Sequence, residues 1–484
     1  MKDRHLFFLG IGGIGMSALA RWFHAHGAEV AGYDRTATPL TEALQREGMP
    51  VDTTGSPDAL PDSLRADLAA RRTDRWTLVH TPAIPDDLPL MAQLRDAGFV
   101  LRKRAEVLGQ LTRDQPLLAV AGTHGKTTTS SLLAHILQHA GQPVEAFLGG
   151  IPRSSGSNLL LAGGDHPRPW IVAEADEFDR SFLTLYPQHA VITSAEADHL
   201  DIYGDAEAFQ KAFHAFAEQV HPEGLLLHTD AAAALTASSS LPGGHALYGQ
   251  LDPSDPWPDR WCAAHSHPDA DGFRTHFVLR LKGEDPLDIH WPMPGVHNAA
   301  NATAAAALAI RTGVPSNAIS PALAAFPGIA RRFELRHDQP GLTVIDDYAH
   351  HPSEITGTVA AARSAYRGRR LVGVFQPHLF SRTRDFMDAF AEALSALDHC
   401  ILLPIYPARE RPIPGVDAQG VGEKMVGCPV ETPEESRFLD VLEQCEPDVL
   451  LFMGAGDLDR WIPPSIERLS RSKTTHREQP TPQP

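Results

Sequence analysis

The sequence has few cysteines, no long apolar run and no excess of basic side chains. Its four cysteines are scattered without C-x-x-C spacing, which excludes a disulfide framework and a thiolate metal site as organising elements. No segment reaches the roughly 18 apolar residues that a membrane-spanning helix needs, and no basic-then-apolar signal follows Met1. We therefore expect a soluble cytoplasmic protein that has no membrane partner.

Positive charge is scarce as well. The 42 Lys and Arg residues stand against 60 Asp and Glu residues, which gives a formal net charge of -18. Such a charge opposes non-specific binding to nucleic acid. Any phosphate-bearing ligand must therefore be held by local features of the chain.

The chain of 484 residues is longer than a domain built around one hydrophobic core usually is. We therefore expect about three domains. Polar residues 111–116 and the hinge-like segment 326–333 indicate the boundaries. Residues 231–268, rich in Ala, Ser, Pro, Asp and Gly, are interpreted as a loop or insertion. The predicted division is a first domain at 1–112, a central domain at 113–328, a third domain at 329–468 and a disordered tail at 469–484.

Short apolar strands alternate with helical patterns, which predicts an α/β protein built on parallel sheets. The expected helices lie at residues 16–26, 126–136 and 298–311. The expected strands lie at residues 6–9, 77–80, 117–121, 170–173, 190–193, 343–345, 371–375, 400–403 and 449–452, with one more ending near Asp34.

A first glycine-rich loop follows the first strand. Gly10, Gly12 and Gly15 fit G-x-G-x-x-G, and Asp34 lies at the expected distance downstream. Backbone amides of such a loop can hold a pyrophosphate at the start of a helix. A dinucleotide and a nucleotide-sugar diphosphate fit equally well, and a tight turn that merely needs glycine is the alternative.

A second loop is more specific, although Val120 replaces the first glycine of a strict phosphate loop. Gly122, Gly125, Lys126 and Thr127 remain. Lys126 can neutralise the β- and γ-phosphates of ATP, and the hydroxyl of Thr127 can ligate Mg²⁺. We expect the lysine side chain to face solvent when no nucleotide is bound.

Acidic clusters follow the next two strands. Glu174 stands in the first cluster and His199 in the second. Glu174 is a candidate ligand for Mg²⁺, which prefers oxygen, and His199 is a candidate ligand for a second ion. The alternative for each cluster is a set of solvated loop charges.

Two polar clusters follow strands of the third domain and predict one wall of a cleft. His378 and Arg382 can bind a substrate carboxylate through charge-assisted hydrogen bonds. For Arg384 and Asp385, an exposed ion pair on a helix face explains the two residues as well as a role in this cleft does.

Together these residues resemble the Mur ligases along nearly the whole chain, from Leu6 to about Trp461, and in the order of that family. The resemblance is carried by residues 10–17, 122–127, 174–177, 196–201, 294–298, 331–333, 346–352 and 376–378.

The resemblance implies three domains: an N-terminal Rossmann-like domain, a central P-loop mononucleotide-binding ATPase and a C-terminal Rossmann-like domain. It implies an ATP- and Mg²⁺-dependent ligase that joins L-alanine to UDP-N-acetylmuramic acid in peptidoglycan synthesis. The enzyme is expected to be a monomer or weak homodimer. Leu379 stands where an arginine is common in such enzymes.

The same resemblance assigns site residues. The catalytic residues would be Lys126, Glu174, His199 and Arg332, and the metal ligands Thr127, Glu174 and His199. The UDP-sugar would be bound by Gly10, Gly12, Gly13, Ile14, Gly15 and Asp34. The amino acid would be bound by Tyr348, His351, His378 and Arg382. ATP would be bound by Gly122, Thr123, His124, Gly125, Lys126, Thr127, Thr128, Asn298, Asn301 and Arg332.

Three other functions compete with this hypothesis. An NAD-dependent dehydrogenase explains the first glycine loop but leaves the second loop unexplained. An ATP-driven switch explains Lys126 but not the polar clusters of the third domain. A recycling ligase that adds a tripeptide to the same UDP-sugar shares the ATPase core, but its first loop typically departs from the Gly10–Gly15 pattern kept here.

Overall fold

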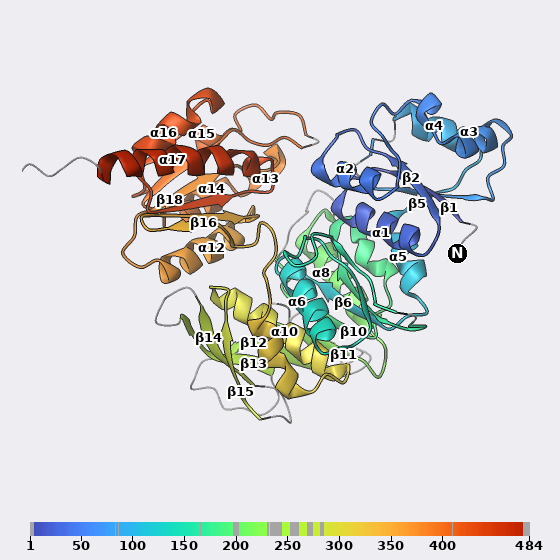
Figure 1. Cartoon of the computed structure of the whole chain (residues 1–484), viewed down its shortest axis with the longest axis horizontal. Helices are drawn as coiled ribbons and strands as arrows, with labels where there is room; N and C mark the ends of the chain where they lie inside the picture. The colour runs from blue at the N-terminus through green and yellow to red at the C-terminus, as the bar shows by residue number, and fades with distance from the viewer. Residues whose placement is uncertain are drawn as a thin grey trace, which may run out of the picture. The chain divides into compact units, whose positions relative to one another are not determined.

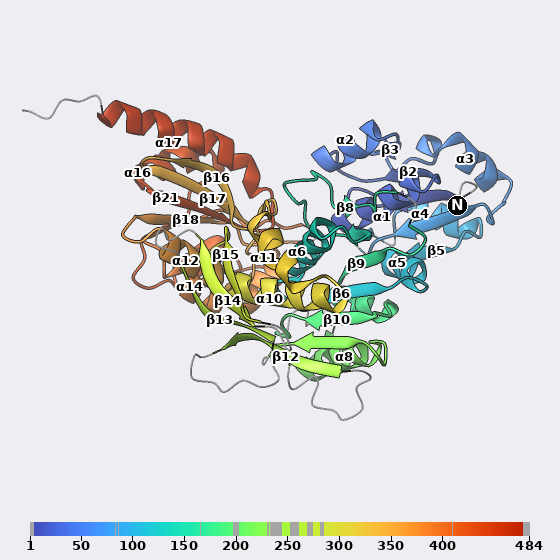
Figure 2. The same cartoon turned by 60° about the horizontal axis from the view of Figure 1, so that its bottom comes forward.

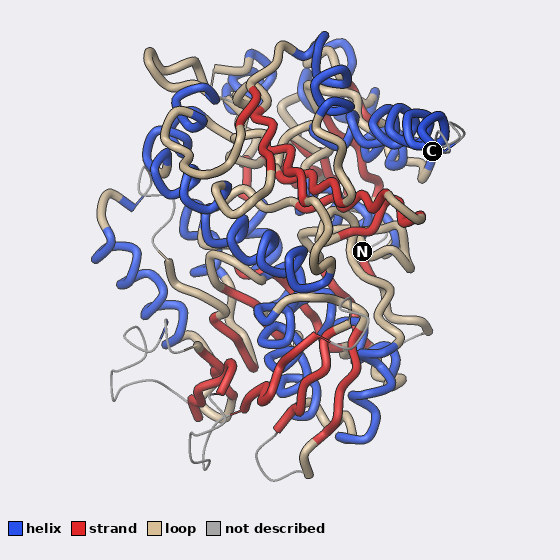
Figure 3. Tube along the Cα trace, turned by 90° about the vertical axis from the view of Figure 1, so that its left-hand side faces the viewer, coloured by secondary structure: helices blue, strands red, loops and turns tan. Residues whose placement is uncertain are grey.

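The computed structural model describes residues 4–82, 84–85, 87–164, 166–196, 203–229, 232, 244–251, 261–268, 274–280, 285–408 and 410–477. These residues form two compact units. Unit 1 comprises residues 1–264, 279–287 and 300–327, and unit 2 comprises residues 265–278, 288–299 and 328–484. Figure 3 shows how strands and helices alternate along the trace. Among the described residues, no helix is both long enough and apolar enough to cross a membrane.

Unit 1 begins with a parallel five-stranded sheet in the order β3-β2-β1-β4-β5. Its strands are β1 (His5–Leu9), β2 (Glu29–Tyr33), β3 (Val51–Asp52), β4 (Trp76–His80) and β5 (Leu101–Lys103). Its helical elements are α1 (Ile14–Ala25), α2 (Pro39–Arg46), η1 (Pro57–Ala59), α3 (Asp62–Ala69), α4 (Pro89–Asp96) and α5 (Arg104–Thr112).

The central strands β1, β2 and β4 are mostly apolar and buried, as expected for a parallel sheet that is covered on both faces. Figure 1 shows α1 and α5 on one side of the strands and α3 and α4 on the other. The register pairs Leu9 with both Tyr33 and His80, so three strands end side by side. The first glycine loop starts at this carboxyl edge.

Seven strands of a second, ten-stranded sheet lie in unit 1 in the order β12-β11-β10-β6-β9-β7-β8. They are β6 (Leu117–Ala121), β7 (Val144–Phe147), β8 (Leu159–Leu160), β9 (Trp170–Ala175), β10 (His189–Ile192), β11 (Leu225–His228) and β12 (Gly244–Leu251). The helical elements are α6 (Lys126–His139), η2 (Phe178–Thr184), α8 (Ala206–Glu218), η4 (Ser316–Ala318) and α11 (Ile319–Ala324).

Four elements have residues in both units. They are β13 (Trp261–Pro268), β14 (Thr275–Arg280), β15 (Leu287–Trp291) and α10 (Val296–Arg311). β12 and β13 correct the interpretation of residues 231–268 as a loop or insertion, because both strands fall within that range. The composition of this range favours loops, although the range contains two strands. Apart from residue 232, the rest of the range lies outside the described residues.

Unit 2 contains a six-stranded sheet in the order β16-β17-β21-β18-β19-β20, parallel except for the β16–β17 pair. Its strands are β16 (Glu334–Gln339), β17 (Leu342–Asp347), β18 (Leu371–Phe375), β19 (His399–Leu402), β20 (Val430–Glu431) and β21 (Val449–Met453). Its helical elements are α12 (Pro352–Ala365), α13 (Phe380–Asp385), α14 (Met387–Leu394), α15 (Ala418–Gly422), η5 (Glu435–Arg437), α16 (Phe438–Gln444), η6 (Leu458–Trp461) and α17 (Ile462–Arg477).

This third sheet also has two covered faces. Figure 2 shows α16 and α17 on one side of the strands and α12 and α14 on the other. Separate apolar clusters fill the two faces. Helix α17 continues to Arg477, in contrast to the tail expected to be disordered from residue 469, while residues 478–484 lie outside the described residues.

Candidate active site

The first glycine loop is held by backbone contacts at the carboxyl edge of the first sheet. Gly10 has φ +88° and donates its N–H to the carbonyl oxygen of Tyr33 at 2.7 Å. A side chain there would place its Cβ 2.6 Å from the methyl group of Thr81. The loop then leads into α1 at Gly13, so its backbone is arranged as a diphosphate cradle requires.

Asp34 has a structural role in this loop. Its carboxylate accepts hydrogen bonds from the N–H of Gly12 at 2.8 Å and from the N–H of Thr36 at 3.1 Å. These bonds fix the loop against the end of β2. Contact between Asp34 and a UDP-sugar therefore stays a prediction.

Arg104 is a candidate that sequence reasoning missed. A Cβ on Gly15 would lie 2.8 Å from its Nη1 atom, and its Nη2 atom is 3.7 Å from an oxygen of Asp176. The first contact places a guanidinium beside the start of α1, where an anion would bind. No spacing rule reveals it, because α5 brings Arg104 to the loop from a distant part of the chain.

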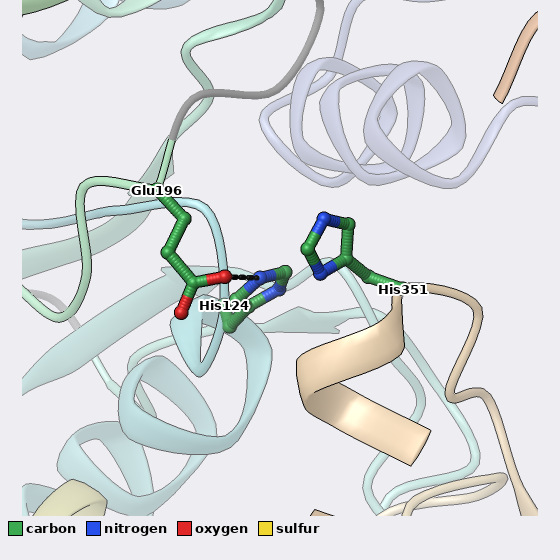
Figure 4. A group of neighbouring side chains, drawn as sticks. All are labelled: His124, Glu196 and His351. Carbon is green, nitrogen blue, oxygen red and sulfur yellow. Dashed lines mark ion pairs between the residues drawn. The ribbon is translucent and has the colours of Figure 1, made fainter. Parts of the chain in front are cut away.

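The second glycine loop lies between β6 and α6 and packs on the segment after β10. Gly122 has φ +126°, and a Cβ there would lie 2.2 Å from the Thr193 hydroxyl oxygen. The N–H of His124 donates to the hydroxyl of Ser194 at 2.8 Å. Figure 4 shows the imidazole of His124 facing Glu196, at 3.4 Å between Nε2 and Oε2. Residues after β10 therefore shape the phosphate loop.

Lys126 is not solvent-facing, which corrects the sequence-based expectation. Its ammonium group donates to Glu177 at 2.7 Å and to the carbonyl of Gly122 at 2.6 Å. Its side chain is 16% exposed and that of Glu177 only 2%. Burial alone would lower the pKa of Lys126, but Glu177, Asp176 and Glu174 together raise it. The lysine is thus held as a cation, and the sequence did not single out Glu177 as its partner.

Glu174 is positioned at the end of β9 by two hydrogen bonds to Oε1. The N–H of Gly149 donates at 2.7 Å and the hydroxyl of Ser130 at 3.2 Å. Ser130 lies on α6, the helix that also carries Lys126 and Thr127. Both bonds go to Oε1, and the carboxylate packs closely against Gly149, where an added Cβ would lie 2.4 Å from Oε2. Gly149 and Ser130 are positioning residues that the sequence did not indicate.

The remaining predicted ATP residues divide between the two units. Asn301 accepts from the hydroxyl of Thr129 at 3.2 Å, and a Cβ on Gly125 would lie 2.6 Å from its side-chain oxygen. Asn301 is thus in contact with the phosphate loop within unit 1. Asn298 belongs to unit 2, where its amide donates to the carbonyl of Pro294 at 2.7 Å. His199 lies outside the described residues.

Unit 2 places Arg332 in a strained segment before β16. Arg331 has φ +58° and Phe333 has φ +46°, and the N–H of Phe333 donates to Asp347 at 2.7 Å. The guanidinium of Arg332 lies 5.2 Å from the ring centroid of Tyr348 and 3.9 Å from Glu354. Strain of this kind persists only where surrounding contacts enforce it, and here Asp347 provides one of them.

The other predicted amino-acid residues gather beyond the ends of β17 and β18. His351 is buried at the start of α12 and its Nδ1 lies 2.9 Å from the hydroxyl of Ser353. The ring of His378 stacks on Tyr406, with centroids 5.7 Å apart. Arg382 on α13 is 8% exposed. His351 is drawn with two unit 1 residues in Figure 4 but belongs to unit 2.

His350 was not singled out by the sequence. Burial lowers its pKa to about 4, against a smaller effect of Glu354 in the opposite direction. It is therefore a neutral imidazole between Tyr348 and His378, with centroids 5.3 and 6.3 Å from its own. Arg384 and Asp385 form an exposed ion pair at 2.7 Å. An ion pair of this kind was the structural alternative to a role in the site.

The buried carboxyl group of Asp347 predicts a pH-dependent stability. Burial raises its pKa from 3.8 to about 6, so the folded chain keeps the proton over a pH range in which the unfolded chain has lost it. Stability from this group is present below pH 3.8 and falls as pH rises to about 6. The free energy of unfolding of Asp347→Asn minus that of the wild type should increase by up to about 3 kcal/mol across that range. Denaturant titrations every half pH unit check this, and a flat difference would contradict it.

A glycine loop that leads into a helix bearing a charged lysine, near a carboxylate suited to Mg²⁺, is typical of an ATP-using enzyme. The chain belongs to the Mur ligase family. Residues 5–116 match the model for the Mur ligase family catalytic domain, residues 120–309 that for the Mur ligase middle domain, and residues 331–456 that for the Mur ligase glutamate ligase domain.

Individual relatives agree with this assignment. A UDP-N-acetylmuramate–L-alanine ligase of Cytophaga hutchinsonii is 40% identical over 95% of both chains. The enzyme of that name from Christiangramia forsetii is 41% identical over 95% of this chain and 97% of its own. The crystal structure of the UDP-N-acetylmuramate–alanine ligase from Thermotoga maritima superposes with a TM-score of 0.77 at 27% identity, covering 97% of this chain and 99% of that one.

A murein peptide ligase from Psychrobacter arcticus shares the fold, with a TM-score of 0.69 at 24% identity over 96% of this chain and 98% of that one. The predicted family and the predicted α/β fold class are confirmed. The domain boundaries and the roles of the site residues stay predictions.

Proposed function

We propose that this chain uses ATP to join L-alanine to the lactyl carboxylate of UDP-N-acetylmuramic acid. The observation that carries the proposal is 40% identity to an L-alanine-adding ligase over 95% of both chains. Lys126, which is paired with Glu177, and the carboxylate of Glu174 supply the local chemistry. The products are UDP-N-acetylmuramoyl-L-alanine, ADP and phosphate.

The reaction proceeds in two steps. An oxygen of the lactyl carboxylate attacks the γ-phosphorus of ATP, the bond to the β-phosphate oxygen breaks, and ADP leaves from an acyl phosphate. The amine of L-alanine then attacks the acyl carbon, phosphate departs with the C–O electron pair, and the nitrogen loses a proton. Lys126 stabilises the negative charge that moves onto the β–γ bridging oxygen.

The donor set beside the phosphate loop fits Mg²⁺. The hydroxyl of Thr127 and the carboxylate of Glu174 are hard oxygen ligands, and Mg²⁺ beside a nucleotide takes one or two such groups from protein. When bound, Mg²⁺ neutralises phosphate charge. Gly149 and Ser130 hold Glu174 in place for it.

The substrates divide among the sites by their chemistry. The UDP diphosphate is assigned to the loop Gly10–Gly15 together with Arg104, since both offer positive potential at a helix start. The α-carboxylate of L-alanine is assigned to Arg382 and His378, and Tyr348 and His351 line the same pocket. Arg332 is assigned to the ATP phosphates. We place the enzyme in the cytoplasm, without a nucleic-acid or membrane partner. We expect it to be a monomer or a weak homodimer.

An amine-selectivity assay tests the proposal. Phosphate release with ATP and UDP-N-acetylmuramate should depend on added L-alanine, with kcat/KM higher than for glycine by about 10- to 200-fold, because one methyl group in a fitted pocket discriminates on that scale. NAD should neither bind nor be reduced. A higher kcat/KM for the tripeptide L-Ala-γ-D-Glu-meso-diaminopimelate would replace the proposal with the recycling reaction.

A further inference from the structure

Strands β14 and β15 are neighbours in their sheet and carry a polar cluster outside the candidate active site. Burial alternates along both strands: Phe277 on β14 and Ile289 on β15 are fully buried, whereas their neighbours His276, Asp288 and His290 lie on the open face. Since side chains of a strand alternate between its two faces, the three polar residues project from the same side.

The three side chains converge at one point. Nε2 of His276 contacts Oδ1 of Asp288, and Nε2 of His290 lies 3.8 Å from Oδ2 of the same carboxylate. The two imidazole rings stack almost in parallel, 7° apart with centroids separated by 4.4 Å. One ligand atom from each residue lies within 4.8 Å of the other two. Stacking thus directs both ring nitrogens toward one carboxylate.

We propose that His276, Asp288 and His290 form a binding site for a divalent transition metal ion such as Zn²⁺. Two imidazole nitrogens and one carboxylate oxygen are a ligand set that Zn²⁺ accepts, with water completing the coordination. The same set discriminates against Mg²⁺, which prefers oxygen. All three residues belong to unit 2, and none of them is among the proposed Mg²⁺ ligands Thr127 and Glu174, which belong to unit 1.

The bound ion would add a further link between two neighbouring strands that His276 and Asp288 already join. His276 comes from β14, whereas Asp288 and His290 come from β15. An ion that binds only the folded arrangement stabilises it by mass action. The inference stands apart from the proposed ligase activity, because none of the three residues is assigned to substrate.

Zn²⁺ titration of the full chain tests the site. Metal-free protein in saturating Mg²⁺ is titrated with Zn²⁺ against a chromophoric chelator, and Co²⁺ absorption reports nitrogen ligation. The wild type should bind one equivalent more than His276→Ala/His290→Ala. Asp288→Asn should weaken that equivalent by about tenfold or more, since even indirect changes around a metal ligand have effects of that size. His337→Ala, which removes another strand histidine of unit 2, should bind like the wild type.

Thermal unfolding supplies an independent readout. Zn²⁺ should raise the melting temperature of the wild type and of His337→Ala but not that of the double variant, while all three should melt alike without metal. Equal Zn²⁺ stoichiometry and affinity in wild type and double variant would overturn the proposal. If the double variant melts lower without metal, the comparison passes to Asp288→Asn, and unchanged Zn²⁺ affinity there would overturn the proposal as well.

Discussion

Lys126→Ala is expected to lower the turnover of amide formation at least about 100-fold, the scale on which removal of a single transition-state charge contact acts. The lost ammonium group is already charged and aimed into the phosphate loop, because Glu177 and the carbonyl of Gly122 hold it. The variant keeps the loop glycines, so it should retain ATP binding better than turnover. Single-turnover phosphate release with UDP-N-acetylmuramate measures the effect.

The same substitution also has a stability consequence. It leaves Glu177, only 2% exposed, without its cation, and removal of one partner of a buried pair costs about 3–5 kcal/mol. Lys126→Ala/Glu177→Gln removes the orphaned charge as well. It should recover most of the stability but none of the turnover, which separates the catalytic effect from unfolding.

Lys211→Ala is the matched control. Lys211 is 73% exposed and pairs with Glu207 one helical turn away, so its loss should leave both turnover and unfolding nearly unchanged. Near-normal turnover in a folded Lys126→Ala/Glu177→Gln protein would remove Lys126 from the mechanism.

Much of unit 1 could be predicted because its motifs are local. The strand before the second loop was predicted at residues 117–121, the bounds of β6, and the helix that follows contains the predicted residues 126–136. Glycines at positive φ, such as Gly122 and Gly125, mark the loop directly in the sequence. Backbone requirements of this kind depend on the local sequence, so they can be predicted without knowledge of the tertiary structure.

The features of the site that could not be predicted from the sequence depend on contacts between distant segments of the chain. Glu177 belongs to a recognised acidic cluster, but only the fold shows that it, and not Glu174, pairs with Lys126. Arg104 reaches Gly15 from another helix. The strands β12 and β13 lie in a segment whose Ser, Pro, Asp and Gly content favours loops. They form because tertiary pairing overrides weak local preference.

Glu174→Ala should also reduce turnover by about 100-fold, since the Mg²⁺ that Glu174 is proposed to hold would supply several kcal/mol of charge stabilisation. The reduction should be partly relieved by high Mg²⁺ if weakened metal binding is its cause. Steady-state rates over a Mg²⁺ series measure this, and a Mg²⁺ dependence identical to that of the wild type would remove Glu174 from the metal site.

Gly149→Ala tests whether the position of Glu174, and not only its charge, is required. A Cβ there would lie 2.4 Å from Oε2, closer than any real contact, so the carboxylate must move off the Gly149 N–H. Turnover should fall and the Mg²⁺ requirement should rise, while UDP-N-acetylmuramate affinity stays unchanged. Gly141→Ala is the control at another glycine of unit 1, where no atom lies within 4 Å of the added Cβ. Because Gly141 has φ +74°, it reports backbone strain without a clash at the carboxylate. If Gly141→Ala shifted the Mg²⁺ dependence as far as Gly149→Ala, general strain would explain both results and the positioning role of Gly149 would fail.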